Sequence, residues 1–416
     1  MPISWKKRPA LKPEIILSRI QAVRNVDSND KVFFRGFDLH ELLPVLQSML
    51  EFPLAANIVE PSTLVWKTVA NMTGDLTPKA FIASINSTLS KEISTKETEY
   101  YILTSISINS IGLPNRIIQG DGTIFVRHRD YPKKYAKPRE DAIRKRKQQI
   151  EIDDTPSNYT KLIIKVISKS PYGAMTNALN VLDTQRAIWC LLSNHSMELI
   201  GNPINPINVI RTGGIHTIHY KDGTIASDNV WYEPNFSKAT LFTSKDTELL
   251  NKDSKYAFRN LRQSKYNKDI RNSLLRYVRA LDEKDQNTAF LKLWGALETL
   301  ASPNLANYEK LIKRCSFLFK DHEYHQQILE HLREYRNQSI HSGDQVDNAK
   351  THCYQLQQYY YQLVWFHLRN ASFFRTLDET NEFLEFTVNI DSLKRSKRLI
   401  LKALKFIHPC VTHTTI

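Results

Sequence analysis

Residues 290–300 read Phe-Leu-Lys-Leu-Trp-Gly-Ala-Leu-Glu-Thr-Leu. Apolar side chains recur every three or four positions along this stretch, at Phe290, Leu293, Leu297 and Leu300. That spacing places them on one face of an α-helix. A helix with one apolar face is stabilised by burying that face, so the stretch predicts a helix packed against others in a core.

The same helical spacing continues on both sides of this stretch. After about residue 245 the strand patterns stop, and amphipathic helices joined by short links predict a helical bundle. A shorter basic helix is expected at residues 391–407. The other predicted helices carry their apolar side chains at Ile270, Leu274, Val278 and Leu281, at Tyr308, Leu311, Ile312, Cys315 and Phe319, at Tyr324, Ile328, Leu332 and Tyr335, and at Val346, Ala349, Cys353, Leu356, Tyr360, Leu363 and His367.

The first part of the chain predicts a mixture of strands and helices. Residues 161–168 are rich in β-branched side chains, which favour a strand, and a helical pattern follows residues 171–173. Gly120-Asp121-Gly122 and Asp222-Gly223 separate apolar runs and predict hairpin turns. Thr77 followed by Pro78 predicts a helix start.

The predicted fold class is therefore α+β. Residues 1–245 form a mixed α/β region with a sensing or regulatory role, residues 246–380 form the helical bundle, and residues 381–416 form a basic C-terminal helix and tail.

The charge of the chain indicates a polyanionic partner. Its 416 residues include 57 lysines and arginines against 43 aspartates and glutamates, a net charge of +14. Such a balance is typical of proteins that bind nucleic acid. The sequence contains no Gly-rich phosphate loop of the Walker type, and it lacks a convincing helix-turn-helix signature, which disfavours a DNA-binding regulator.

Cysteine usage and hydropathy predict a cytoplasmic protein. Cys190, Cys315, Cys353 and Cys410 are far apart and form no Cys-x-x-Cys pair, so neither a disulfide framework nor a zinc site is predicted. The first charged residues are not followed by an apolar run, so no signal peptide is expected. Because no apolar run reaches membrane-spanning length, no membrane partner is expected.

Two basic segments are candidate RNA contacts. Residues 252–271 interleave basic side chains with aromatic ones, and are expected to link the domains and to flank an RNA cleft. Residues 133–149 form either a solvated loop or helix face, or an RNA contact in which Tyr131 and Tyr135 are available for base stacking. The candidate contacts there are Lys133, Lys134, Arg144, Lys145, Arg146 and Lys147.

The strongest catalytic candidates are Arg336 and His341. Histidine moves protons near neutral pH, and arginine binds phosphate and stabilises the charge that develops on it. With the polar Asn337 beside the arginine, this combination suits RNA cleavage. The structural alternative is that Arg336 forms a salt bridge with Glu298 or Glu334, and that His341 caps a helix C-terminus.

The spacing of the pair constrains the site. Arg336 follows Leu332 by four residues, so it borders the buried stripe of its helix. Gly343 can end that helix, and Asp344 can cap the next. Five residues separate two helical side chains by about 140°, so Arg336 and His341 would not share a face. Either the helix loosens before His341, or half of the site comes from another subunit.

These residues resemble a known family. The C-terminal part, about residues 250–375, resembles the HEPN superfamily of helical ribonuclease domains, in particular its Apea-like branch. Residues 290–300 are similar to the second-helix signature of that branch, with the acidic Glu298 near its end. Residues 336–341 resemble the motif of arginine, polar residue, any three residues and histidine, followed by Ser342-Gly343. The resemblance covers about a third of the chain.

The resemblance implies a dimerising bundle in which two motifs meet in a shared cleft. It also implies cleavage of tRNA or other host RNA without a metal or cofactor, leaving a 2′,3′-cyclic phosphate and a 5′-hydroxyl. Arg336 and His341 would then be the catalytic pair, with Asn337 orienting the site and Glu298 positioning the arginine.

The expected function is an endoribonuclease effector of antiphage defence, of the abortive-infection or toxin type. The N-terminal region would sense a phage-derived or cellular trigger, or restrain the nuclease. The alternative is a non-catalytic HEPN-type dimerisation module that binds RNA or a protein, with Arg336 and His341 used for binding or packing.

Overall fold

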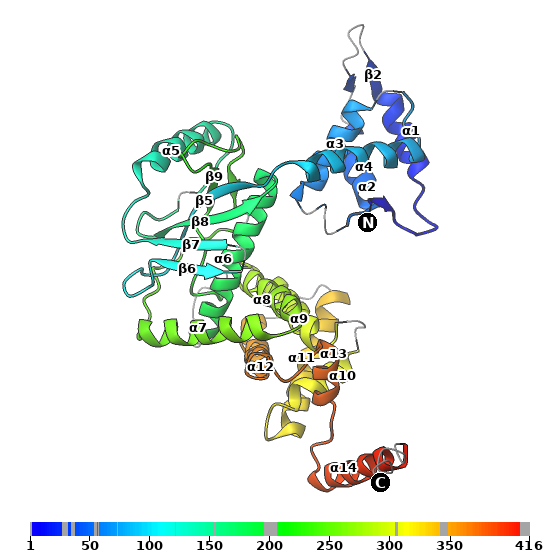
Figure 1. Cartoon of the computed structure of the whole chain (residues 1–416), viewed down its shortest axis with the longest axis vertical. Helices are drawn as coiled ribbons and strands as arrows, with labels where there is room; N and C mark the ends of the chain where they lie inside the picture. The colour runs from blue at the N-terminus through cyan, green and yellow to red at the C-terminus, as the bar shows by residue number, and fades with distance from the viewer. Residues whose placement is uncertain are drawn as a thin grey trace, which may run out of the picture. The chain divides into compact units, whose positions relative to one another are not determined.

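The structure is a computed structural model that describes residues 2–26, 32–34, 38–53, 56, 58–72, 74–120, 122–153, 155–194, 206–233, 235–303, 307–341 and 348–407. Figure 1 shows the elements along the chain. In order, they are β1 (Ser4–Trp5), α1 (Pro13–Val23), β2 (Arg24–Val26), β3 (Val32–Phe34), α2 (Asp38–Ser48), β4 (Leu50–Glu51), α3 (Pro61–Asn71), α4 (Pro78–Ser94), β5 (Thr98–Ile106), β6 (Arg116–Gln119), β7 (Gly122–Arg127), α5 (Lys133–Lys147), β8 (Thr160–Ser168), α6 (Pro171–Ser193), β9 (Ile215–His219), β10 (Trp231–Tyr232), α7 (Thr247–Gln263), α8 (Asn267–Ala280), α9 (Gln286–Ala301), α10 (Tyr308–Ser316), α11 (His322–His341), α12 (Ala349–Arg369), α13 (Leu377–Leu384) and α14 (Ile390–Ile407).

The chain divides into two compact units. The α/β unit comprises Met1–Ile106, Pro114–Leu182 and Thr212–Pro234. The helical unit comprises Ser107–Leu113, Asp183–Arg211 and Asn235–Ile416. The predicted α+β class is confirmed, because strands build the first unit and helices build the chain from α7 onward.

The centre of the α/β unit is a six-stranded antiparallel sheet with the order β10-β9-β5-β8-β7-β6. The predicted strand at residues 161–168 is confirmed as β8, which pairs with β5 along its whole length. The predicted turn before Gly122 is also confirmed, since β6 and β7 form a hairpin with Gly120 at a φ of 50°. Gly223 forms the second predicted turn with a φ of 103°.

Both faces of this sheet are buried. On one face Ile102 and Ile164 lie opposite each other and are completely buried. A Cβ added to Gly122 on β7 would lie 2.9 Å from Val181, so α6 packs directly against that strand. On the other face, Leu103 and Ile163 form a small core with Tyr135 of α5.

Helices α1–α4 enclose a separate core ahead of the sheet. Its members include Leu17, Leu46, Leu64 and Phe81, none of which is exposed to solvent. Thr77 caps α4 by accepting a hydrogen bond from the backbone N–H of Ala80 at 3.2 Å, and Pro78 occupies the first turn. The predicted helix start is therefore confirmed.

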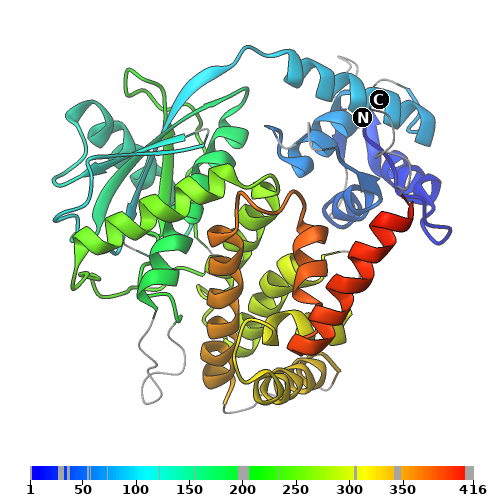
Figure 2. The ribbon, with the colours of Figure 1, turned by 60° about the horizontal axis from the view of Figure 1, so that its bottom comes forward.

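The helical unit packs around α9, the helix formed by the Phe290 stretch. Phe290, Leu293, Leu297 and Leu300 are completely buried, as their spacing predicts. Helix α9 packs against both α8 and α12. Helix α12 is the orange-brown helix in Figure 2. The rings of Tyr277 on α8 and Tyr360 on α12 stack with centroids 4.6 Å apart.

Two predictions about this unit are wrong. Residues 252–271 are not a linker, because they form most of α7 and the start of α8. Leu250, Phe258 and Leu261 are buried on one side of α7, and the basic side chains at positions 252, 255, 259 and 262 lie on its exposed side. Tyr324 also does not join the buried stripe of α11, since it is 58% exposed.

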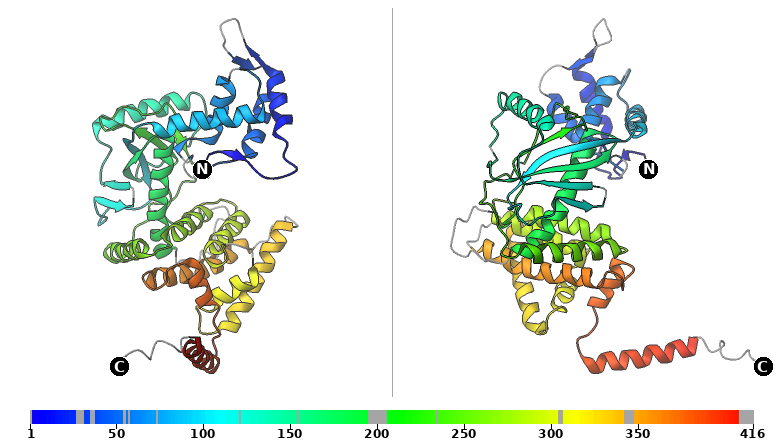
Figure 3. Two further views of the ribbon diagram at one scale, coloured as in Figure 1. Left: turned by 45° about the vertical axis from the view of Figure 1, so that its right-hand side comes forward. Right: turned by 60° about the vertical axis from the view of Figure 1, so that its left-hand side comes forward.

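Helix α14 stands apart from the other helices of its unit, as Figure 3 shows. It confirms the basic helix predicted at residues 391–407. None of its side chains is buried. Within the part of the chain that the structure describes, no helix has the length and apolar character needed to cross a membrane.

Candidate functional site

The candidate catalytic motif lies at the C-terminal end of α11, and this end is fixed by packing. Leu332 is completely buried and Tyr335 is nearly so. The Tyr335 ring meets Phe290 of α9 edge to face at 4.7 Å, and its hydroxyl donates to Asn287 Oδ1 at 2.5 Å. The adjacent Arg336 is therefore carried by a well-anchored turn.

Arg336 is half-buried and rests on an aromatic ring. Its guanidinium lies 4.9 Å from the centre of the Tyr308 ring, and its Nη1 donates to Asn337 Oδ1 at 3.3 Å. Among the described residues it forms no ion pair with Glu298 or Glu334. Glu334 lies instead 3.7 Å from Arg333. The guanidinium thus keeps hydrogen-bonding capacity for a phosphate.

Glu298 reaches this site only through two aromatic rings. Its carboxylate accepts a hydrogen bond from Trp294 Nε1 at 3.0 Å. The Trp294 ring in turn meets Tyr308 edge to face at 6.1 Å, and Tyr308 underlies Arg336. The acidic residue therefore orients the tryptophan that supports Tyr308, which is an indirect route to the arginine.

The helix does not loosen before His341. Helix α11 is helical through His341, so backbone positions 336 and 341 lie about 140° apart around its axis. Of the two geometric alternatives, a helix that loosens before His341 does not fit this backbone, and a site completed by another subunit stays a prediction. The side chain of His341 lies outside the described residues, as do Gly343 and Asp344.

The basic segment at residues 133–149 forms the exposed helix α5. Lys133, Lys134, Arg144 and Lys145 are exposed, and Arg146 and Lys147 are half-buried. Arg144 pairs with Asp141 at 2.7 Å, and Lys134 Nζ donates to the carbonyl of Lys221 at 2.6 Å. Several of these candidate contacts thus have partners within the protein.

The expectation that Tyr131 and Tyr135 are available for stacking is wrong. Tyr135 is 3% exposed and packs on the sheet with Leu103. The Tyr131 hydroxyl donates to the carbonyl of Thr104. Nearby, Arg139 is buried and donates to the carbonyls of Leu103 and Ile215 at 3.0 Å and 2.9 Å. Tyr135 and Arg139 anchor α5 to the sheet, and Tyr131 packs partly buried against the same core.

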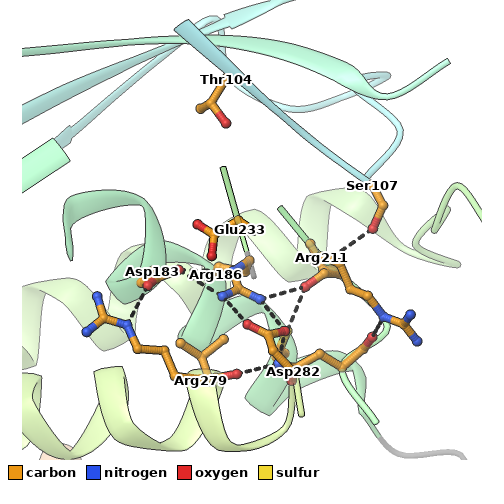
Figure 4. A network of polar contacts seen from close by, with 12 residues as sticks. Thr104, Ser107, Asp183, Arg186, Arg211, Glu233, Arg279 and Asp282 are labelled. Carbon is orange, nitrogen blue, oxygen red and sulfur yellow. Dashed lines mark hydrogen bonds and ion pairs between the residues drawn. The ribbon is translucent and has the colours of Figure 1, made fainter. Parts of the chain in front are cut away.

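A buried ion-pair network in the helical unit was not indicated by the sequence. Figure 4 shows the Arg186 guanidinium between two carboxylates, with Asp183 at 2.8 Å and Asp282 at 2.6 Å. Arg279 bonds the other oxygen of Asp183 at 2.8 Å. Burial alone would raise the pKa of Asp183, but the two guanidinium groups outweigh it and hold that pKa below its ordinary value. Asp282 follows Arg186 by 96 residues, so no local spacing could reveal the pair.

The α/β unit contains a cavity of about 500 Å³. Its lining mixes aromatic and charged side chains, among them Trp231, Tyr172 and the ion pair of Lys67 with Glu92 at 3.0 Å. Arg146 also lines it, and its buried Nε atom has no hydrogen-bond partner among the described residues. A small ligand with polar groups would fit this lining.

Within the described ranges, no three His, Cys, Asp or Glu side chains gather where they could hold a metal ion. Comparisons with protein-family models, with curated proteins and with solved structures found no match for this chain.

Proposed function

We propose that the chain is an endoribonuclease that acts without a metal and functions as a homodimer, with Arg336 and His341 as its catalytic pair. The observation that carries the proposal is the burial of Arg336 and its lack of an ion pair among the described residues. Arg336 is half-buried against Tyr308, and no carboxylate pairs with it in the described ranges. Placing a guanidinium there without a counter-charge costs free energy, and a bound phosphate group would offset that cost.

The proposed reaction is an internal transfer within RNA. The ribose 2′-oxygen attacks the adjacent phosphorus as its proton is removed, and the bond from phosphorus to the 5′-oxygen breaks as that oxygen gains a proton. His341 is the base that takes the first proton or the acid that supplies the second. Arg336 stabilises the charge on the pentacoordinate phosphate. The products are a 2′,3′-cyclic phosphate and a 5′-hydroxyl.

The role of RNA cleavage in antiphage defence or toxin-type growth arrest is part of the proposal, with tRNA as the first substrate to test. The N-terminal region would sense the trigger. The cavity lined by Trp231, Tyr172 and Arg146 supports this assignment, because it offers polar and aromatic groups to a small ligand.

A second candidate is a non-catalytic module that binds RNA or a protein. The continuity of α11 favours it, since backbone positions 336 and 341 of one chain lie on different sides of the helix axis. In that case both side chains would serve binding or packing alone.

The proposal is tested with purified full-length protein, total tRNA and EDTA, followed by mapping of the RNA ends. We expect wild type to leave cyclic phosphate ends, and His341→Ala and Arg336→Ala to lose about 100-fold or more of the rate. His331→Ala and Arg333→Ala, on the same helix, are the matched controls and should stay active. The assay is run with and without extract of phage-infected cells. Cleavage by His341→Ala at the wild-type rate, or none under either condition, would reject the proposal.

Tyr308 should position Arg336 through its ring. Replacing Tyr308 by leucine removes a cation–π contact of about 0.5–2 kcal/mol, so we expect a loss of about 2- to 30-fold in kcat. Tyr308→Phe keeps the ring and should keep the rate. A purely structural role would predict a fall in thermal midpoint that parallels the fall in kcat, and the two quantities are measured together.

A further inference from the structure

Helix α7 presents a row of basic side chains on one side. Lys252, Lys255, Arg259 and Arg262 recur at intervals of three or four residues, so they share one face, and all four are exposed. Together with Tyr256 they line a groove of about 770 Å³. We call these five residues the α7 groove. From Lys252 to Arg262 the helix rises about 15 Å, which accommodates several consecutive phosphates of an extended strand.

The α7 groove is strongly cationic, since its lining contains four basic side chains and the carboxylate of Glu248. Within the described ranges none of its four cations forms an ion pair, whereas cations elsewhere in the unit do, as Lys292 does with Glu283. The one carboxylate that lines the groove is Glu248, near the start of the helix. Neighbouring positive charges repel one another, and a bound polyanion would offset that repulsion.

An aromatic platform lies within this row. Tyr256 is 37% exposed, and its ring stacks on Trp365 of α12 with centroids 6.2 Å apart and an interplanar angle of 26°. The Arg259 guanidinium lies 5.4 Å from the Tyr256 ring centre, and that of Arg369 lies 5.9 Å from the ring centre of Trp365. The buried Trp365 Nε1 has no hydrogen-bond partner among the described residues. An exposed ring supported from behind and flanked by cations suits stacking of an unpaired base.

We propose that the α7 groove binds single-stranded RNA. The four cations contact successive phosphates, and Tyr256 stacks on a base. A duplex offers phosphates but no free base face, so the platform favours single strands. The inference rests on the proposed function for its choice of RNA as the ligand. The proposed RNA-binding side chains lie on α7 and are supported by α12. They are different from the proposed catalytic pair at the end of α11.

The test measures binding of a fluorescein-labelled, unstructured 12-nucleotide RNA to full-length His341→Ala protein, so that the RNA is not cut. Adding Lys255→Gln with Arg259→Gln should weaken binding at least about tenfold and lower the salt slope by about 1.4, which is 0.7 for each lost contact. Tyr256→Leu should weaken it about 5- to 100-fold with an unchanged salt slope. The matched control is Lys394→Gln with Arg398→Gln on α14, which removes the same charge from another exposed helix.

Equal losses in the α14 control, equal affinity for duplex RNA, or no RNA binding by the parent protein would overturn the inference. Its failure is distinguishable from failure of the proposed function. If the α7 variants bind normally while wild type cleaves RNA, the inference fails alone. If they lose binding while wild type cleaves nothing under any condition, the catalytic proposal fails alone.

Discussion

Replacing Arg186 by methionine is expected to lower the free energy of unfolding of the helical unit by about 3–5 kcal/mol at pH 7. The Arg186 side chain is 2% exposed and is shared between Asp183 and Asp282, whose side chains are 10% and 22% exposed. Methionine retains much of the length of the side chain, so the loss comes chiefly from the missing charge. Removing Arg186 leaves Asp282 without an ion-pair partner among the described residues and leaves Asp183 with Arg279 alone, so the buried negative charge is no longer balanced.

This loss should shrink as the pH falls. The pKa of Asp183 is lowered in the folded protein, so its ion pairs stabilise the fold above the unfolded pKa of about 4. Their contribution is lost as the pH falls through the folded pKa. Without Arg186, the Asp183 carboxyl keeps only Arg279 as an ion-pair partner among the described residues, so it takes up a proton at a higher pH than in the wild type.

Urea unfolding followed by tryptophan fluorescence checks this prediction. Arg333→Met is the control, because Arg333 pairs with Glu330 at the surface and its loss should cost about 1 kcal/mol or less. If Arg186→Met does not fold, the triple variant with Asp183→Asn and Asp282→Asn should recover folding, since no carboxylate remains unpaired. A loss below about 1 kcal/mol in Arg186→Met would show that the network does not hold the unit together.

Sequence periodicity predicted the elements whose burial follows a strong local pattern. Leu293 and Leu297 show the helical spacing that α9 confirms, and the β-branched run at residues 161–168 is the strand β8. The linker prediction for residues 252–271 is wrong because the basic side chains there lie on the exposed side of a helix whose other side buries Leu250, Phe258 and Leu261.

Contacts between distant residues decided the features that the sequence could not reveal. Tyr135 and Arg139 stand in a basic run that resembles a solvated surface, yet they are buried because Leu103, Ile163 and Thr217 meet them across the sheet. The candidate motif shows the same limit. Its residue types were evident from the sequence, but the support of Arg336 by Tyr308 joins residues 28 positions apart and is seen only in the fold.

A purified heterodimer of Arg336→Ala and His341→Ala chains is expected to cleave RNA at about half the wild-type rate, although each variant alone is inactive. The reason is the continuity of α11 through His341, which separates backbone positions 336 and 341 of one chain by about 140° around the helix axis. If each site combines Arg336 of one chain with His341 of the other, the heterodimer keeps one intact site of two. If both residues of a site come from one chain, it keeps none.

The experiment uses two affinity tags on co-expressed chains and tandem purification, so that only heterodimers are assayed. A heterodimer of Arg336→Ala with the double variant Arg336→Ala, His341→Ala is the matched control, because it lacks an intact site under either arrangement. Recovery in the first heterodimer and background rates in the control would assign the site to both subunits. Background rates in both, from a dimer that still binds RNA, would contradict a shared site. If wild type cleaves RNA, that result would assign both residues of each site to one chain.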